Sequence, residues 1–417
     1  MISTVTLAWR NVRRNKRRTA LTFTAITVGI AAFLLSTTII GGIDETSLRN
    51  FINTDTAHIR IMTPAYFTER SDKPLTNFID NYSAIVSALS SNGIAACPRI
   101  KYNASVIKDS QELFANVTGI DPERDRNVFT LLRSVVSNTA LPPVQAVEQF
   151  TAGTNRCLIG LRLASTLGVS PGDEITVSTR TRYGANNADT YVIAGMIFCD
   201  NPEYDAFGII LPLQSAAALA DTGDAASEIA VAAHSRSADD IEKVLYALRP
   251  LLPNTVTAFS WREQLADVLL FFTLRQAGQK IILALLLIMA IAGVTNTMLM
   301  AVFERTKEIG TLAAMGMKQI HIMRLFLVEG IIIGVIGSFF AIIVTAGPVL
   351  YIRFAGIPLF GTDTLANMPV SSRLYGYLQA WYYPAAFLIG IIVSAAATIY
   401  PSYKAASLNI AAVLRGK

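Results

Sequence analysis

The sequence predicts a membrane protein in which four transmembrane α-helices carry one large α+β extracytoplasmic domain, inserted between helices 1 and 2. Three observations lead to this fold class. First, 52% of the 417 residues are hydrophobic and only 16% are charged, whereas soluble domains carry roughly 25% charged residues. Second, four apolar runs are long enough to cross a bilayer, which takes about 20 residues. Third, the block between the first two runs has the composition of a water-soluble domain.

The four runs are Thr19–Ile40, Ile281–Val302, Leu325–Tyr351 and Ala380–Tyr400. We assign the transmembrane helices to residues 19–43, 276–302, 325–351 and 380–400. The other segments are an N-terminal amphipathic segment (1–18), the α+β domain with helical stalks (44–275), a loop (303–324), a second loop (352–379) and a tail (401–417).

Lysine and arginine are concentrated in three short segments, a bias that sets the orientation of membrane helices. Residues 1–18 hold six basic and no acidic side chains, and both 303–324 and 401–417 are also net basic. The block 44–280 is net acidic instead. We therefore expect both termini and the 303–324 loop in the cytoplasm and the α+β domain outside. The net charge of +5 mainly reflects this topology, so nucleic acid is not an expected partner.

The N-terminal segment places apolar residues at helical spacing, with most arginines elsewhere: Ile2, Val5, Trp9 and Val12. This pattern favours a short amphipathic helix in the cytoplasmic interface; a merely basic flank is the alternative. The first apolar run is too long for the core of a cleaved signal peptide, and no A-x-A-like site follows it. An uncleaved signal anchor is the better interpretation.

The α+β domain shows a β-α-β pattern at each end, around a centre richer in strands and turns. The first pattern is strand Ala57–Thr63, helix Asn77–Ser91 and strand Ile94–Ile100; the second is strand Glu228–Ser235, helix Ala238–Arg249 and strand Thr255–Phe259. In the centre, a hairpin is predicted around Gly184–Asp189. One repeated unit split by an insertion is the economical interpretation, and two unrelated β-α-β units are the alternative.

A long helix connects this domain to the second span. From Trp261 to Val302 the pattern stays helical without proline. At 1.5 Å per residue such a helix reaches about 60 Å, twice the hydrocarbon thickness. The sequence thus predicts a rigid stalk.

Motifs for catalysis and metal binding are missing. The sequence has no G-x-x-x-x-G-K-[ST] loop, H-E-x-x-H, G-x-S-x-G or CxxC, so we assign no catalytic residue and no metal ligand. Cys97, Cys157 and Cys199 fall in the α+β domain with no metal-ligand spacing. We interpret them as buried small side chains; one disulfide plus a free thiol is the alternative.

Small and polar residues in the third and fourth spans indicate helix packing. Gly330 and Gly334 form a small-xxx-small pair, and Gly390 and Ser394 belong to a small stripe on the fourth span; such stripes let helices approach closely. Glu329 is a costly group inside a membrane. It lies near Arg324 and without further acids at mid-span depth, so we expect it to pair with a basic residue or to reach the interface rather than to relay protons.

The loop after the second span has a distinctive composition. In FERTKEIGTLAAMGMKQ (Phe303–Gln319), charged residues precede a Gly-punctuated helix with an apolar and small face. Such a helix suits a groove on another protein.

Glu304–Ser338 resembles the E-R-x-x-E-I-G…G…F-L-x-E-G signature of the MacB/FtsX-type ABC transporter permeases, and is most similar to their lipoprotein-releasing LolC/LolE branch. Leu7–Thr22, Cys157–Val177, Asn201–Leu219, Ser260–Leu265 and Tyr400–Lys417 also resemble family segments, in family order. The resemblance covers nearly the whole chain. Residues 122–149 do not align with the family pattern, and no segment matches the loop by which lipoprotein-releasing members engage their periplasmic acceptor.

The resemblance implies a MacB-like periplasmic core and a permease subunit of a bacterial inner-membrane ABC complex. Such subunits dimerise, with themselves or a paralogue, and dock ABC ATPase chains that hold ATP and Mg; this chain would hold no cofactor. They work by mechanotransmission, moving stalks and outer domains. By motif position, the ATPase-coupling residues are Glu304, Arg305, Lys307, Glu308, Ile309, Gly310, Ala314 and Gly316.

The family resemblance also orders the candidate functions. Extraction of lipoproteins for release to a periplasmic carrier comes first. The alternatives are export of amphiphilic peptides or antibiotics, as in MacB, and regulation of cell-wall hydrolases without transport, as in FtsX. The size of the α+β block argues against the last, and an independent membrane enzyme is disfavoured by the missing catalytic motifs. The substrate, the acceptor and the dimer partner stay open.

Overall fold

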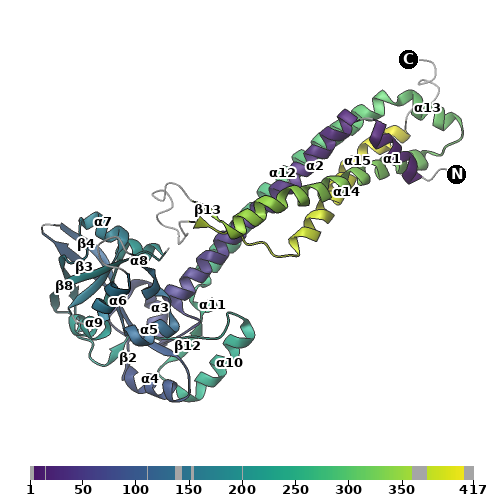
Figure 1. Cartoon of the computed structure of the whole chain (residues 1–417). Helices are drawn as coiled ribbons and strands as arrows, with labels where there is room; N and C mark the ends of the chain where they lie inside the picture. The colour runs from purple at the N-terminus through teal and green to yellow at the C-terminus, as the bar shows by residue number, and fades with distance from the viewer. Residues whose placement is uncertain are drawn as a thin grey trace. The chain divides into compact units, whose positions relative to one another are not determined.

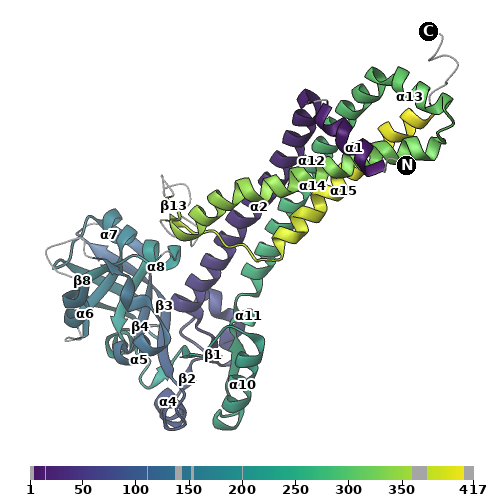
Figure 2. The ribbon, with the colours of Figure 1, turned by 45° about the vertical axis from the view of Figure 1, so that its right-hand side comes forward.

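The computed structural model describes residues 4–14, 16–109, 111–136, 143–151, 155–199, 201–358 and 373–407. The chain forms two compact units (Figures 1 and 2). Of the described residues, the membrane unit comprises 4–45, 271–358 and 373–407, and the α+β unit comprises 46–270.

The membrane unit is built from helices that lie side by side in both views. They are α1 (Thr4–Arg14), α2 (Lys16–Phe51), α12 (Ala266–Glu304), α13 (Thr306–Ala314), α14 (Gln319–Phe354) and α15 (Tyr382–Ala406), with a small hairpin of β13 (Ile357–Pro358) and β14 (Arg373–Leu374). Within the described residues, four helices are long and apolar enough to cross a membrane, namely α2, α12, α14 and α15. The predicted four-helix membrane part is confirmed. Both α2 and α12 begin in one unit and end in the other.

The outer strands of the α+β unit form a split β-α-β arrangement. In the order β12 (Thr257–Ser260), β1 (Ile59–Met62), β11 (Glu228–Val231) and β3 (Ala96–Lys108), every neighbouring pair is antiparallel. Helix α4 (Tyr82–Ser91) connects β1 to β3, and α10 (Ala238–Leu248) connects β11 to β12. The two predicted β-α-β units are therefore interleaved in one sheet, with the pattern of ferredoxin-like folds.

The inserted segment forms a closed ring of six strands. Strand β3 pairs with β4 (Gln111–Ile120), and the ring continues through β9 (Gly208–Pro212), β6 (Arg156–Gly160), β8 (Asn186–Ile197) and β7 (Glu174–Arg180) back to β3. Alternate residues fill its interior with apolar side chains, including Tyr102, Val117, Ile159 and Val177. Ring closure leaves these strands without a free edge.

Short elements complete the α+β unit. The helices are α3 (Pro64–Glu69), α5 (Pro122–Val128), α6 (Pro143–Thr151), α7 (Leu161–Leu167), α8 (Pro202–Phe207), α9 (Leu213–Ala220) and α11 (Trp261–Gln264); the strands are β2 (Ile79–Asp80), β5 (Val135–Val136) and β10 (Ala225–Ala226). The tighter or wider helical turns are η1 (Ile52–Thr56), η2 (Arg70–Asp72), η3 (Leu131–Ser134) and η4 (Arg249–Leu251).

Two predicted helices differ from the structure at their starts. The helix expected over Asn77–Ser91 begins at Tyr82, because Ile79–Asp80 pair with β10 and Asn81 takes a positive φ of 53°. The stalk expected from Trp261 is interrupted at Leu265, which is buried in the sheet core. A capping box between Ser260 and Glu263 starts the short α11, and α12 then runs from Ala266.

Candidate functional site

Helix α13 follows α12 at once and ends in a glycine-dependent turn. After Ala314, the N–H of Gly316 donates to the Ala313 carbonyl, and the N–H of Met317 donates to the Leu312 carbonyl. This is the Schellman arrangement, which needs a left-handed residue after the helix. Gly316 supplies it with φ +90°. Its role in the fold is therefore to end α13, whatever else it contacts.

The inner face of α13 packs on its own chain. Ile309 is 4% exposed and contacts Val302, Ile322 and Phe326, and Gly310 is also buried. Of the proposed coupling residues, these two thus hold α13 against the membrane helices.

A chain of ion pairs fixes the start of α13. Arg14 donates two hydrogen bonds, of 2.6 and 2.8 Å, to the Glu308 carboxylate, and Arg305 Nε donates to the same carboxylate at 2.8 Å. The Arg305 guanidinium also lies 3.6 Å from Glu329, which is fully buried. The expectation that Glu329 pairs with a basic residue is confirmed. These contacts tie α1, α13 and α14 together.

The remaining coupling candidates are exposed on α13 or directly beside it: Glu304 is the last residue of α12, and Gly316 follows the end of α13. An exposed stripe at helical spacing runs through Glu304, Lys307, Thr311, Ala314 and Met315 to Gly316; we call it the outer stripe. Met315 is 72% exposed. The stripe combines two charges with small and flexible apolar side chains, which suits contact with another protein.

The packing candidates on α14 and α15 are in close contact. A Cβ added at Gly330 would lie 2.3 Å from Thr398 Cγ2, and one at Gly334 would lie 2.7 Å from Ser394 Cβ. Gly390 faces Ser338, and the Ser394 hydroxyl donates to the Gly330 carbonyl at 2.7 Å. Any side chain on these glycines would push the two helices apart.

A second polar site, a buried charge cluster on the sheet of the α+β unit, was not predicted from the sequence. Arg60 on β1, Arg99 and Lys101 on β3 and Glu228 on β11 alternate with apolar residues, so they share one face of the sheet. Such alternation ordinarily indicates a solvated face. Here all four side chains are almost fully buried.

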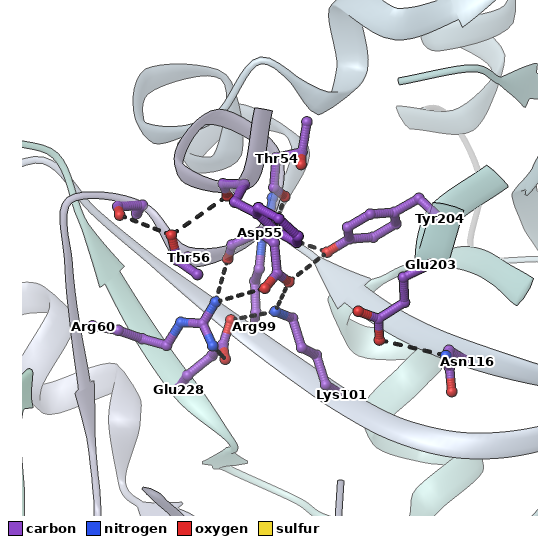
Figure 3. Close-up of polar contacts among 12 residues, drawn as sticks. Thr54, Asp55, Thr56, Arg60, Arg99, Lys101, Asn116, Glu203, Tyr204 and Glu228 are labelled. Carbon is purple, nitrogen blue, oxygen red and sulfur yellow. Dashed lines mark hydrogen bonds and ion pairs between the residues drawn. The ribbon is translucent and has the colours of Figure 1, made fainter. Parts of the chain in front are cut away.

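Three carboxylates, those of Asp55, Asp125 and Glu228, balance the three cations of the cluster; Figure 3 labels Asp55 and Glu228. Arg99 donates from Nε and Nη2 to Asp125 of α5, at 2.9 and 2.7 Å. Arg60 and Lys101 each lie 3.0 Å from the Glu228 carboxylate, and both also contact the Asp55 carboxylate. Tyr204 of α8 donates to Asp55 at 3.3 Å.

The carboxylates of the cluster raise the pKa of its two arginines. Burial alone would lower the pKa of Arg99, but Asp125 outweighs it and raises that pKa; Glu228 and Asp55 do the same for Arg60. Burial also raises the pKa of Tyr204 and of Cys97. The two arginines therefore stay charged inside this structural joint.

The described residues hold no group of three or more His, Cys, Asp or Glu side chains that could bind a metal. Cys97, Cys157 and Cys199 are buried and form no disulfide, as expected for small apolar side chains.

Two family models match the chain. Residues 19–251 match the MacB-like periplasmic core domain, and residues 280–410 match the FtsX-like permease C-terminal domain. The first alone spans more than half of the sequence. The chain belongs to the MacB/FtsX-type ABC transporter permeases.

The permease has several curated relatives. The ABC transporter permease YtrF of Bacillus subtilis is 28% identical over 43% of this chain and 41% of its own length. MacB of Wolinella succinogenes, a macrolide export ATP-binding/permease protein, is 30% identical over 31% of this chain and 17% of its own length. The lipoprotein-releasing system transmembrane protein LolC of Xylella fastidiosa is 23% identical over 80% of each chain.

Solved structures of outer domains also match the permease. The extracellular domain of the transporter YknZ gives a TM-score of 0.31 at 14% identity, covering 48% of this chain and 99% of that domain. The periplasmic region of MacB from Actinobacillus actinomycetemcomitans gives 0.35 at 13% identity, covering 52% and 95%.

Proposed function

We propose that this permease is the membrane subunit of an ABC complex whose ATP-hydrolysing subunits are separate chains that dock on the outer stripe of α13. The proposal rests on the difference between the inner and outer faces of α13. Its inner face is packed and its start is fixed by ion pairs, while the outer stripe is left open. A helix held this firmly can pass a displacement of its outer surface to α14. ATP and Mg would be held by the docked subunit.

The charge bias supports placing both termini and the 303–324 loop in the cytoplasm of a bacterial inner membrane. The α+β unit then lies outside. A second permease subunit, identical or paralogous, completes the complex.

Lipoprotein release is the favoured activity, with transfer to a periplasmic carrier. The support is the relative LolC, which aligns over 80% of both chains, whereas the relatives named for macrolide export align over shorter segments. The spans also lack rows of charged residues, which suits extraction of a lipid-anchored substrate better than conduction through a pore. Export of amphiphilic peptides or antibiotics is the second candidate, because MacB proteins recur among the relatives.

Replacing Ala314 tests the docking surface. Ala314→Trp adds volume to an exposed site, so the free permease should fold normally, but a packed interface there should lose about 1–3 kcal/mol. That corresponds to roughly a 5- to 150-fold loss of ATPase affinity, measured by co-purification. Ala247→Trp, on the exposed surface of α10, is the matched control. If the Ala314→Trp variant co-purifies as much ATPase as wild type, the outer stripe is not the docking surface. Gly316→Leu is a poorer test, because φ +90° strains any side chain there.

The substrate is tested in proteoliposomes that contain the permease, its ATPase and a triacylated lipoprotein. If the permease releases lipoproteins, ATP should drive transfer of the lipoprotein to a soluble carrier. Lipoprotein retention combined with ATP-dependent loss of an amphiphilic peptide would favour the second candidate.

A further inference from the structure

The end of α2 meets the sheet through an unusual backbone. After Phe51 the helix widens into a π-helical turn, η1 (Ile52–Thr56), and Ala57 then takes φ 52° and ψ −166°. A residue with a Cβ is strained in that region, and such strain persists only where the surroundings impose it. Only Ala57 and His58 separate the turn from β1.

The surroundings that impose this backbone are the buried charges. The last carbonyls of a helix lack partners within the helix and carry its negative dipole end. Here three successive carbonyls accept hydrogen bonds. The Asn53 carbonyl accepts from the Thr130 N–H at 2.9 Å. The Thr54 carbonyl accepts from Arg99 Nη1 at 2.8 Å and the Asp55 carbonyl accepts from Arg60 Nη2, four residues that Figure 3 labels.

Arg99 is the residue that joins the separate parts. Its guanidinium binds Asp125 on α5 with two nitrogens and Thr54 at the helix end with the third, which also lies 3.4 Å from the Tyr204 hydroxyl of α8. The ring of Phe129 stacks against it at 3.3 Å. One side chain on β3 therefore connects the end of α2, the sheet and the helices of the insertion.

We propose that Arg99 is a positioning residue for energy coupling: it clamps the end of α2 to the α+β unit, so that movement of α2 is delivered into the sheet and the six-strand ring together. The proposal rests on the proposed function, because it assigns a path to the ATP-driven movement. Glu228 and Lys101 support the clamp by holding Arg60 and Asp55 in place.

Arg99→Lys separates clamping from folding. Lysine keeps the positive charge that Asp125 needs, but one ammonium group cannot reproduce the three-way fork of a guanidinium. Arg156→Lys is the matched control, since Arg156 is a half-buried residue at the start of β6 that contacts Gln149 and not the end of α2. Hydrogen–deuterium exchange of the complex with its ATPase, with and without ATP, is the measurement.

The clamp predicts a local effect of Arg99→Lys. Amides of 53–57 should exchange at least tenfold faster, while β3 and β4 keep their protection. In wild type and in Arg156→Lys, ATP should change the amide exchange rates of both residues 46–56 and strand β1. In Arg99→Lys, ATP should still change the exchange of residues 46–56 but not that of β1. Unchanged exchange at 53–57, or an ATP response of β1 that survives in Arg99→Lys, would overturn the proposal. A different outcome is that ATP changes no exchange rate in the wild-type complex although Arg99→Lys still raises exchange at residues 53–57. That result would refute the proposed function and with it the coupling role of Arg99.

Discussion

Glu329 shows how a single charge is accommodated at the membrane face. Its carboxylate is fully buried, and the Arg305 guanidinium lies 3.6 Å away. Taking a charge out of water is costly, and removing one partner of a buried pair typically destabilises a protein by about 3–5 kcal/mol. Replacing both partners of the pair together typically destabilises a protein far less than removing one of them.

Arg305 and Glu329 should therefore show strong non-additivity. We expect Arg305→Gln to destabilise the permease by about 3 kcal/mol, because Glu329 loses its guanidinium, and Arg305→Gln/Glu329→Gln to recover most of that loss. Thermal unfolding in detergent measures both. A double variant no more stable than the single one would show that the pair is not coupled.

Alanine substitution should destabilise the permease at the packed glycines of α14 but not at glycines that face open space. Gly330→Ala places a Cβ against Thr398 in a packed contact, and we expect a loss of about 1–3 kcal/mol. Gly293→Ala on α12 meets nothing within 4 Å and should be neutral or gain up to about 1 kcal/mol from helix propensity. Equal thermal stability of the two variants would contradict the packing role of Gly330.

Residue patterns predicted apolar faces better than polar ones. The small stripe of Gly330 and Gly334 indicated a helix contact from spacing alone. The alternation around Arg60, Arg99 and Lys101 is of the kind that ordinarily indicates a solvent-exposed face, and a sequence does not reveal that α5, α8 and the end of α2 cover it. Asp125 lies 26 residues from its partner Arg99, and Asp55, only five residues before Arg60, carries no motif that marks it as a partner.

At the scale of elements, α1 and α13 form one assembly. The Arg14–Glu308 pair joins them, and Arg305 and Arg14 lower the pKa of Glu308 below its ordinary value of 4.5. A carboxylate with a lowered pKa contributes stability above its unfolded value and loses it as the pH falls through the folded one. An exposed pair of this kind is worth at most about 1 kcal/mol, so its loss should loosen α1 without unfolding the permease.

This pH dependence can be followed with a spin label at Arg10→Cys, since the native cysteines are buried. Label mobility should stay low at neutral pH and rise as the pH falls below 4.5. Glu308→Gln should be mobile at both pH values, whereas Glu304→Gln, on the exposed surface, should behave as wild type. A Glu308→Gln variant with a rigid label at neutral pH would show that the ion pair does not hold α1.

Helix existence was easier to predict than helix ends. The apolar periodicity of Ala238–Leu248 and the long pattern before Val302 indicated α10 and α12 correctly. The starts of α4 and α12 were missed because tertiary contacts decide them: Ile79–Asp80 pair with a distant strand, and Leu265 is held in the core. The six-strand ring was beyond sequence reasoning, because its closure depends on pairings between distant segments, such as β3 with β7.

At the scale of the whole molecule, two units share two helices. Hydropathy predicted the four spans, and the family signature predicted the permease class. Neither defines the substrate, because the residues that would select it belong to surfaces with no recurrent motif. The sequence did identify α12 as a stalk, and an Asp44–Arg275 ion pair joins it to α2 within the membrane unit.

The proposed mechanism requires that ATP hydrolysis on a docked subunit drives the outer domain through stiff helices. Its most direct test inserts two glycines after Ala277 of α12 and compares them with two alanines inserted at the same place, which shift the helix equally but keep it stiff. Each glycine costs a helix about 1 kcal/mol, so the complex should still assemble and hydrolyse ATP. Substrate release per ATP is the measurement. We expect the glycine insertion to abolish release and the alanine insertion to retain part of it; wild-type release per ATP with the glycine insertion would contradict mechanical coupling through the stalk.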